Sequence, residues 1–336
     1  MASRIQQWRE DLLGSAVRRV VPIMTHPGIE LLGKAVTEVA KDGRSQADVV
    51  LSLAKKYPTS AATMMMDLSL EGEAFGAPIR ISGGEVPSVS GRIVDSIESA
   101  GQLRVPSLNE GRIPQTLLAV RKTAEVLEDR PLFGCCIGPL SLAARLFDVA
   151  ETMTAMLMEP ETIHALLEKT TELLSRYCAA IREAGADGTF IAEPVAGMLP
   201  AHLCDTFSSP YVRRIVAAVQ DDAFMVVLHN CGDTDSLVMS MESTGAGGLH
   251  FGNRCSIVDA LEKIDHRRLV MGNLDPVSVF RMGTPEEVTQ QTNRLLAKTS
   301  AHPNFVISSG CDIPPRTPPA NLAAFFDAVK EYNEGN

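Results

Sequence analysis

Short apolar runs alternate with helical segments along most of this chain of 336 residues. The runs are rich in β-branched or aromatic residues and end near Gly, Pro, Asn or Asp, as buried strands do. They are residues 61–68, 131–137, 188–191, 224–228, 247–251, 269–271 and 305–308. The clearest helical patterns between or after them are residues 161–184, 210–221, 256–263 and 285–298. Strands that alternate with helices pair in parallel, because each crossover helix returns the chain to the same end of the sheet.

This alternation predicts a (β/α)8 TIM barrel. About eight strand–helix units would follow a helical N-terminal extension over residues 1–60, which fits a closed barrel better than an open doubly wound sheet. A dinucleotide-binding sheet would call for a G-x-G-x-x-G turn, and that spacing is absent from the sequence. We therefore expect a single barrel domain over residues 1–336, with the extension packed on it and the chemistry at the C-terminal ends of the strands.

Charge and hydropathy exclude two classes of partner. The formal net charge is −10, and no run of basic residues is longer than two. Phosphate binding needs clustered Lys and Arg, so we expect no nucleic acid. No stretch approaches the ~20 apolar residues of a membrane span. Residues 1–19 have the pattern of an amphipathic helix rather than a signal peptide, so we expect a cytoplasmic protein whose seven cysteines are reduced.

Two of the predicted strands run directly into motifs with metal-binding side chains. Residues 224–228 lead into His229 and Cys231, and residues 305–308 lead into Cys311. Side chains at i and i+2 of an extended segment point the same way, so His229 and Cys231 can bind one ion together. The structural alternative is a core histidine with two inert cysteines, and the strand-end position of Cys311 favours the metal site.

Two thiolates and one imidazole suit Zn²⁺, and three protein ligands leave a fourth position open, as in catalytic zinc sites. The two thiolates make the ion a weak Lewis acid toward carbonyl groups. Such a centre is better suited to binding an incoming thiol, lowering its pKa and keeping it nucleophilic. The three residues therefore predict catalysis through zinc on a thiol substrate.

The sequence also resembles a known family. The segments H-N-C-G-D-T at 229–234, G-C-D-I-P-P-R-T-P-P-A-N-L at 310–322 and M-D-L-S-L-E-G-E-A-F-G at 66–76 are similar to the uroporphyrinogen decarboxylase superfamily. Within it they look like the methylcobamide:coenzyme M methyltransferase branch, as do M-G-N-L-D-P at 271–276 and S-S-P-Y at 208–211.

The resemblance implies a (β/α)8 barrel with zinc on His229, Cys231 and Cys311. It further implies transfer of a methyl group from a methyl-Co(III) corrinoid to a thiol on zinc. No corrinoid-binding D-x-H-x-x-G motif occurs in the chain, so the corrinoid would arrive on a separate carrier protein. Coenzyme M enzymes carry an acidic residue near the position of Asn253, and this departure leaves open whether the acceptor is coenzyme M, another thiol or tetrahydrofolate.

Four further polar residues follow predicted strands and are candidate substrate-binding groups in addition to Asn253. Each also has a structural reading: a helix cap for Asp67, a loop salt bridge for Glu193, and a loop turn for Asn273 and Asp275. The neighbouring Asp233 and Asp312 are candidates to orient the metal-binding imidazole. For Asp233, a helix N-cap is an equally good interpretation. His250 alternates with apolar neighbours and is interpreted as a core histidine.

Two other functions compete with methyl transfer. A porphyrinogen decarboxylase would bind a substrate with several carboxylates and would need an arginine-lined pocket, and Arg80 and Arg112 do not form an evident cluster in the sequence. A non-catalytic zinc-binding or corrinoid-binding protein would hold a methylated partner without transferring the group. We expect the methyltransferase, with the carrier protein and a small acceptor as its partners.

Overall fold

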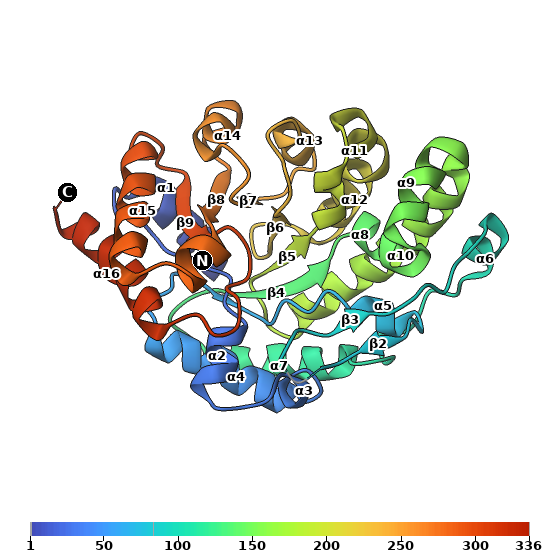
Figure 1. Ribbon diagram of the computed structural model, residues 1–336, viewed down its shortest axis with the longest axis horizontal. Coiled ribbons are helices and arrows are strands. Elements are labelled where there is room, and N and C mark those ends of the chain that lie inside the picture. Colours follow the sequence, from blue (N-terminus) through green and yellow to red (C-terminus); the bar gives the residue numbers. More distant parts are fainter. Residues whose placement is uncertain (1, 83, 336) are drawn as a thin grey trace.

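The computed structural model describes residues 2–82 and 84–335. Seven strands form one parallel, curled sheet in the order β1-β4-β5-β6-β7-β8-β9, with helices around it (Figure 1). Each strand overlaps one of the seven predicted apolar runs, so those predictions are confirmed. The strands are β1 (Ala62–Thr63), β4 (Leu132–Ile137), β5 (Gly188–Ala192), β6 (Met225–Asn230), β7 (Gly248–Phe251), β8 (Leu269–Leu274) and β9 (Phe305–Ser309).

An extended segment, residues 19–23, links the two edges of this sheet. Val20 pairs in parallel with Ile307 of β9, and its carbonyl oxygen accepts a hydrogen bond from the amide of Ser60, next to β1, at 2.8 Å. The prediction of a helical extension over residues 1–60 is therefore wrong at this segment. The physical reason is that Val20, Val21 and Ile23 are β-branched and almost fully buried, so they fit a strand position in the barrel wall.

Helices cover the outside of the sheet, and the four predicted helical patterns are found at α10 (Pro160–Glu183), α12 (Ser209–Val219), α14 (Ile257–Lys263) and α15 (Pro285–Lys298). No helix in the described part of the chain is long and apolar enough to cross a membrane. Besides the sheet, β2 (Ile79–Arg80) and β3 (Ser88–Val89) form a small antiparallel pair. The helices are α1 (Arg4–Gly14), α2 (His26–Leu31), α3 (Val36–Val39), α4 (Gly43–Lys56), α5 (Leu70–Ala74), α6 (Ile97–Gln102), α7 (Ile113–Ala124), α8 (Pro139–Phe147), α9 (Val149–Met158), α10 (Pro160–Glu183), η1 (Pro194–Met198), α11 (Ala201–Phe207), α12 (Ser209–Val219), α13 (Val238–Glu242), α14 (Ile257–Lys263), η2 (Pro276–Arg281), α15 (Pro285–Lys298) and α16 (Pro319–Gly335).

The apolar core has two parts, one inside the curled sheet and one between the sheet and its helices. Every second residue of a strand points into the interior part, because successive side chains point to opposite faces of a sheet. The interior part includes Phe133, Phe190, Met225, Met271 and Val306. Their alternation places His229 on β6 and His250 on β7 in the interior as well, next to each other in the register of the two strands.

Helix α1 closes the N-terminal end of the interior. Its buried Ile5 and Leu12 belong to the interior core, and Trp8 packs against that core. The Trp8 ring lies 5.7 Å from the Phe133 ring, and its indole N–H donates to the carbonyl of Ser60 at 2.8 Å. The expected amphipathic N-terminal helix is thus present between Arg4 and Gly14, and its apolar face seals one end of the sheet.

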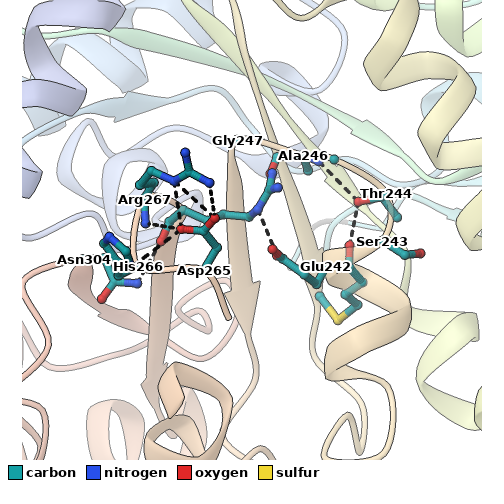
Figure 2. A network of polar contacts seen from close by, with 12 residues as sticks. Glu242, Ser243, Thr244, Ala246, Gly247, Asp265, His266, Arg267 and Asn304 are labelled. Atoms are coloured by element: carbon teal, nitrogen blue, oxygen red, sulfur yellow. Dashed lines mark hydrogen bonds and ion pairs between the residues drawn. The ribbon is translucent and has the colours of Figure 1, made fainter. Parts of the chain in front are cut away.

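The loops that precede β7, β8 and β9 are joined by polar contacts on this same N-terminal side (Figure 2). Arg268 forms an ion pair with Glu242 at 2.8 Å and donates to the carbonyl of Ala246. The side chain of Asn304 donates to the carbonyl of Arg268 at 2.9 Å. Contacts at this end of a parallel barrel stabilise the fold, whereas chemistry is placed at the opposite end.

Candidate metal centre at the ends of β6 and β9

Three side chains converge where β6 and β9 end. One ligand atom from each of His229, Cys231 and Cys311 lies within 4.8 Å of the other two. Within the described residues, this is the one group of three or more His, Cys, Asp or Glu side chains placed to share a metal ion. The sequence prediction that these residues lie together therefore agrees with the geometry, although they come from loops 80 positions apart.

The imidazole of His229 has one nitrogen engaged and one free. Its Nδ1 lies 2.8 Å from Nδ1 of His250, which is wholly buried on the neighbouring strand. Its Nε2 is buried and has no hydrogen-bond partner in the described structure. Buried polar atoms are nearly always paired, so an unpaired nitrogen beside two thiols fits a metal ligand.

Close backbone contacts between strand-end loops bring the two cysteines together. A Cβ atom added at Gly252 would lie 2.6 Å from Cα of Cys231, and one at Gly310 would lie 2.7 Å from the amide nitrogen of Asn253. A Cβ at Gly232 would lie 2.8 Å from Cα of Gly197. Only glycine allows backbones to approach this closely. The loops after β5, β6, β7 and β9 therefore form one packed layer around the ligands.

The two thiols influence each other's ionisation. A hydrogen bond from Cys311 lowers the pKa of Cys231 to about 4, and His229 adds to this lowering. The same contact, together with burial, raises the pKa of Cys311 well above its ordinary value. The pair therefore holds one negative charge easily, whereas a second thiolate requires a cation beside it.

This donor set fits zinc. Two thiolate sulfurs and one imidazole nitrogen are ligands that zinc prefers, and a tetrahedral ion at ~2.1–2.3 Å from each would place them within 4 Å of one another. Cys231 and Cys311 are only partly buried, so solvent reaches part of each cysteine. A site with three protein donors and one open side can admit a substrate atom.

Asp67 lies in a separate ionic network after β1. One carboxylate oxygen accepts from the amide and hydroxyl of Ser69 at 2.9 and 2.6 Å, and the other is paired with Arg112. Arg112 also contacts Glu73 at 2.6 Å. The carboxylate is therefore held in the turn that leads into α5, and its predicted role in substrate binding stays a prediction.

Glu193 is directed at the N-terminus of α8. Its carboxylate accepts from the amides of Leu140 at 3.0 Å and Ser141 at 2.6 Å, and from the Ser141 hydroxyl. Burial raises the pKa of Glu193 to about 7, although these hydrogen bonds oppose the shift. The alternative interpretation of Glu193 as part of a loop salt bridge does not hold, because its partners are backbone amides and a hydroxyl at the start of α8. A contact with substrate stays a prediction.

Asn253, Asn273 and Asp275 connect the loops after β7 and β8. Asn253 donates to Asp275 at 2.9 Å, and Asp275 also accepts from two amides at the start of η2. Asn273 donates to the carbonyls of Gly252 and Cys255 at 3.0 and 2.8 Å. These contacts hold the loop that packs on Cys231, and substrate contacts by the three residues stay predictions.

Sequence reasoning missed the partner of His229. Asp233 and Asp312 are the candidates that the sequence offers to orient the imidazole, whereas the structure places His250 beside it. Asp312 accepts from the amide of Thr25 at 2.8 Å. Strand alternation could have indicated this partner, because His250 occupies the same inward position on β7 as His229 does on β6. Burial lowers the pKa of His250 well below its ordinary value, so the ring is neutral.

Comparisons with known proteins agree with this architecture. The chain is 30% identical over 299 residues to the methylcobamide:CoM methyltransferase MtbA of Methanosarcina acetivorans, covering 87% of this chain and 86% of the relative. It is 27% identical over 303 residues to the uroporphyrinogen decarboxylase of Dichelobacter nodosus, covering 88% and 86%. The structure of a methyltransferase from Methanosarcina mazei superposes with a TM-score of 0.88 at 24% identity over 99% of both chains.

The fold of that solved structure is the fold found here, and the family resemblance drawn from the sequence motifs is confirmed. The sequence model of the family described as Uroporphyrinogen decarboxylase (URO-D) matches residues 16–332 of this chain. The match begins just before the extended segment that links the sheet edges and ends within α16, so it spans the sheet and both cysteine loops. The chain therefore belongs to the uroporphyrinogen decarboxylase (URO-D) family.

Proposed function

We propose that the protein is a methyltransferase that moves a methyl group from a methyl-Co(III) corrinoid to a thiol activated at a zinc site. The observation that carries the proposal is the convergence of His229, Cys231 and Cys311 within 4.8 Å, with Nε2 of His229 unpaired. The similarity to MtbA, which is a methylcobamide:CoM methyltransferase, supports the corrinoid as donor. The corrinoid would be carried by a separate protein.

Each residue of the centre would supply a different donor to the ion. His229 supplies one neutral nitrogen, and Cys231 and Cys311 supply two negative charges. Bound zinc would leave one position for the acceptor sulfur and lower the pKa of its thiol. The thiol proton would pass to solvent, the sulfur lone pair would form the new S–C bond, and the electron pair of the broken Co–C bond would stay on cobalt. The balance needs no external oxidant or reductant.

The identity of the acceptor depends on the open side of the centre. Asn253 lies in the loop beside Gly310 and is exposed, and its amide is engaged with Asp275. An amide supplies no carboxylate to a resting metal, so the fourth position is more accessible to an incoming ligand than an acidic residue would leave it. We propose a small thiol as acceptor, with coenzyme M one member of that class.

Decarboxylation is the second candidate because one observation favours it. Arg80, Arg281 and Arg316 line one open pocket of about 650 Å³, together with the acidic Glu85, and guanidinium groups recognise carboxylates. Arg112, by contrast, is neutralised by Asp67 and Glu73. A substrate with several carboxylates would suit the three-arginine pocket, and relatives named uroporphyrinogen decarboxylase are among the matches. This activity would need no zinc.

The decisive experiment measures zinc content and methyl transfer in the same preparations. The wild-type chain should bind about one zinc ion and methylate a small thiol with free methylcobalamin as donor. Cys311→Ala should lose both properties, whereas Cys204→Ala, which removes a buried thiol of α11, should retain both. Full transfer by zinc-free Cys311→Ala protein would refute the proposal. Turnover of uroporphyrinogen would favour the decarboxylase, and corrinoid binding without transfer would favour a carrier role.

A further inference from the structure

A continuous chain of hydrogen bonds runs from His229 to the segment that links the sheet edges. Nδ1 of His229 lies 2.8 Å from Nδ1 of His250. Nε2 of His250 lies 2.8 Å from Oγ of Ser308, and that hydroxyl donates to the carbonyl of Val21 at 2.7 Å. His229, His250 and Ser308 are all buried, at 1%, 0% and 0% exposure, so water does not compete for these contacts.

The last hydrogen bond of this series, to the carbonyl of Val21, determines which atom is the donor in each of the others. A carbonyl oxygen can only accept, so the Ser308 hydroxyl donates its single proton to Val21 or to its alternative acceptor, the carbonyl of Ser309 at 3.0 Å. Ser308 Oγ must then accept from Nε2–H of His250. A neutral imidazole has one N–H, so Nδ1 of His250 holds a lone pair and accepts from Nδ1–H of His229. The remaining nitrogen of His229, Nε2, carries a lone pair.

The opposite assignment is disfavoured by the charge it places on His250. If Nδ1 of His229 were the acceptor, His250 would need protons on both nitrogens, because Ser308 already accepts from its Nε2–H. That puts a positive charge on a ring with no exposed surface. A buried charge without a balancing partner is unfavourable.

We propose that His250 and Ser308 are positioning residues that hold His229 in the tautomer whose Nε2 lone pair faces Cys231 and Cys311. The ring is then oriented before any cation arrives, and the cation displaces no proton from it. The inference rests on the zinc site proposed above for the role of the tautomer, whereas the tautomer itself follows from the hydrogen bonds alone. Outer partners of metal-binding histidines commonly change metal affinity by ~10–100-fold.

The first test reads the tautomer in metal-free protein. With ¹⁵N-labelled imidazoles, long-range ¹H–¹⁵N NMR distinguishes protonated from unprotonated ring nitrogens, and the chain has only seven histidines. The His229 signals are assigned by their loss in His229→Gln. We expect a protonated Nδ1 and an unprotonated Nε2 in the wild type. A protonated Nε2 of His229 in folded, metal-free protein would overturn the proposal, whether or not the enzyme transfers methyl groups.

The second test measures zinc affinity by competition with a chelator, without any methyl donor. His250→Phe should weaken zinc binding ~10–100-fold, because His229 loses the acceptor that fixes its tautomer. His250→Asn should recover part of the affinity if its amide oxygen accepts from Nδ1–H. Ser308→Ala should have a smaller effect, since His250 then loses only its own acceptor.

The matched control is His164→Phe, because His164 is also hydrogen-bonded through Nδ1, to Tyr211 at 2.7 Å, but belongs to α10. It should leave zinc affinity unchanged. Thermal unfolding of each metal-free variant separates a lost fold from a lost tautomer. Wild-type zinc affinity in folded His250→Phe protein would overturn the proposal. If zinc affinity changes as expected in the variants but the wild-type protein transfers no methyl group, only the proposed reaction is refuted.

Discussion

Glu71 carries a carboxyl group that the protein interior makes difficult to ionise. The side chain is fully buried. One oxygen accepts from the amide of Ile137 at 3.1 Å, and the other has no hydrogen-bond partner in the described structure. Burial raises the pKa of Glu71 to about 8. Since the folded state binds this proton more tightly than the unfolded state, stability falls as pH rises from about 4.5 to about 8.

We therefore predict that Glu71→Gln weakens this pH dependence. At ~1.4 kcal/mol per pKa unit, the rise of the pKa from 4.5 to about 8 corresponds to a loss on the order of 5 kcal/mol in wild-type stability once the pH exceeds 8. Glu71→Gln should unfold at a higher urea concentration than the wild type near pH 9 and at a similar one near pH 5. The exposed Glu331→Gln serves as control. Parallel pH profiles for wild type and Glu71→Gln would contradict the prediction.

At the level of single residues, the sequence predicted the position of side chains that follow a strand, as the convergence of His229, Cys231 and Cys311 shows. His229, Cys231 and Cys311 each come just after or at the end of an apolar run, so their face of the barrel was predictable. Glu193 also follows a strand, yet its carboxylate contacts α8. Position along the chain does not tell which way a loop carboxylate turns. The role of His250 was missed because an inward histidine looks the same in sequence whether it packs or supports a ligand.

Among the elements, the loops around the metal centre depend on their glycines. A Cβ at Gly252 or Gly310 would overlap the backbone of the neighbouring loop, and backbone cannot move aside as a flexible side chain can. We predict that Gly252→Ala and Gly310→Ala each cost about 1–3 kcal/mol of stability and weaken zinc binding more than tenfold. Gly101→Ala in α6, where a Cβ would meet no atom within 4 Å, should leave zinc binding unchanged and stabilise the protein by up to ~1 kcal/mol, because alanine favours helix more than glycine does. Zinc titration and urea unfolding of the three variants give the comparison, and unchanged zinc affinity in Gly310→Ala would contradict it.

Two helices allow a comparison of buried and exposed caps. The start of α8 depends on Glu193, which is buried, and α15 begins with an exposed capping box at Thr284. We predict that Glu193→Ala costs roughly 2–4 kcal/mol, because two amides of α8 lose their acceptor away from water. Thr284→Ala should cost ~1 kcal/mol. Urea unfolding with unchanged m-values would measure both costs, and equal costs would contradict the assignment of Glu193 as a cap.

Element prediction from sequence was reliable for strands in long apolar runs and failed for the segment 19–23. That segment contains Pro22, which has no amide hydrogen, and it lies between helical patterns. Its strand position is set by contacts with Ile307 and Ser60, which are far away in sequence. Tertiary pairing of this kind leaves no local periodicity to detect. The β-branched residues Val20, Val21 and Ile23 were the available signal.

At the scale of the whole molecule, different elements cover the two ends of the barrel, and both ends pack on one core. Helix α1 closes the N-terminal end through Ile5, Trp8 and Leu12, and the loops that carry Cys231 and Cys311 cover the other end. Between them, the carbonyl of Val21 accepts from Ser308, so the segment that joins the sheet edges also supports the chain of contacts to His229. A substitution at either end should therefore change the stability of the whole barrel, because both ends belong to one cooperative unit.

Trp8 is the only tryptophan of the chain, so its fluorescence reports on the end of the barrel remote from the metal centre. We predict that its thermal transition coincides with loss of far-UV circular dichroism, as expected for one cooperative unit. Added zinc should raise both midpoints equally, because a ligand that binds only the folded state stabilises all of it, by about 2.7 kcal/mol at a hundredfold excess over Kd. In Cys311→Ala the same zinc should raise neither midpoint. A Trp8 transition that precedes the loss of helix signal and ignores zinc would show that α1 unfolds independently of the barrel.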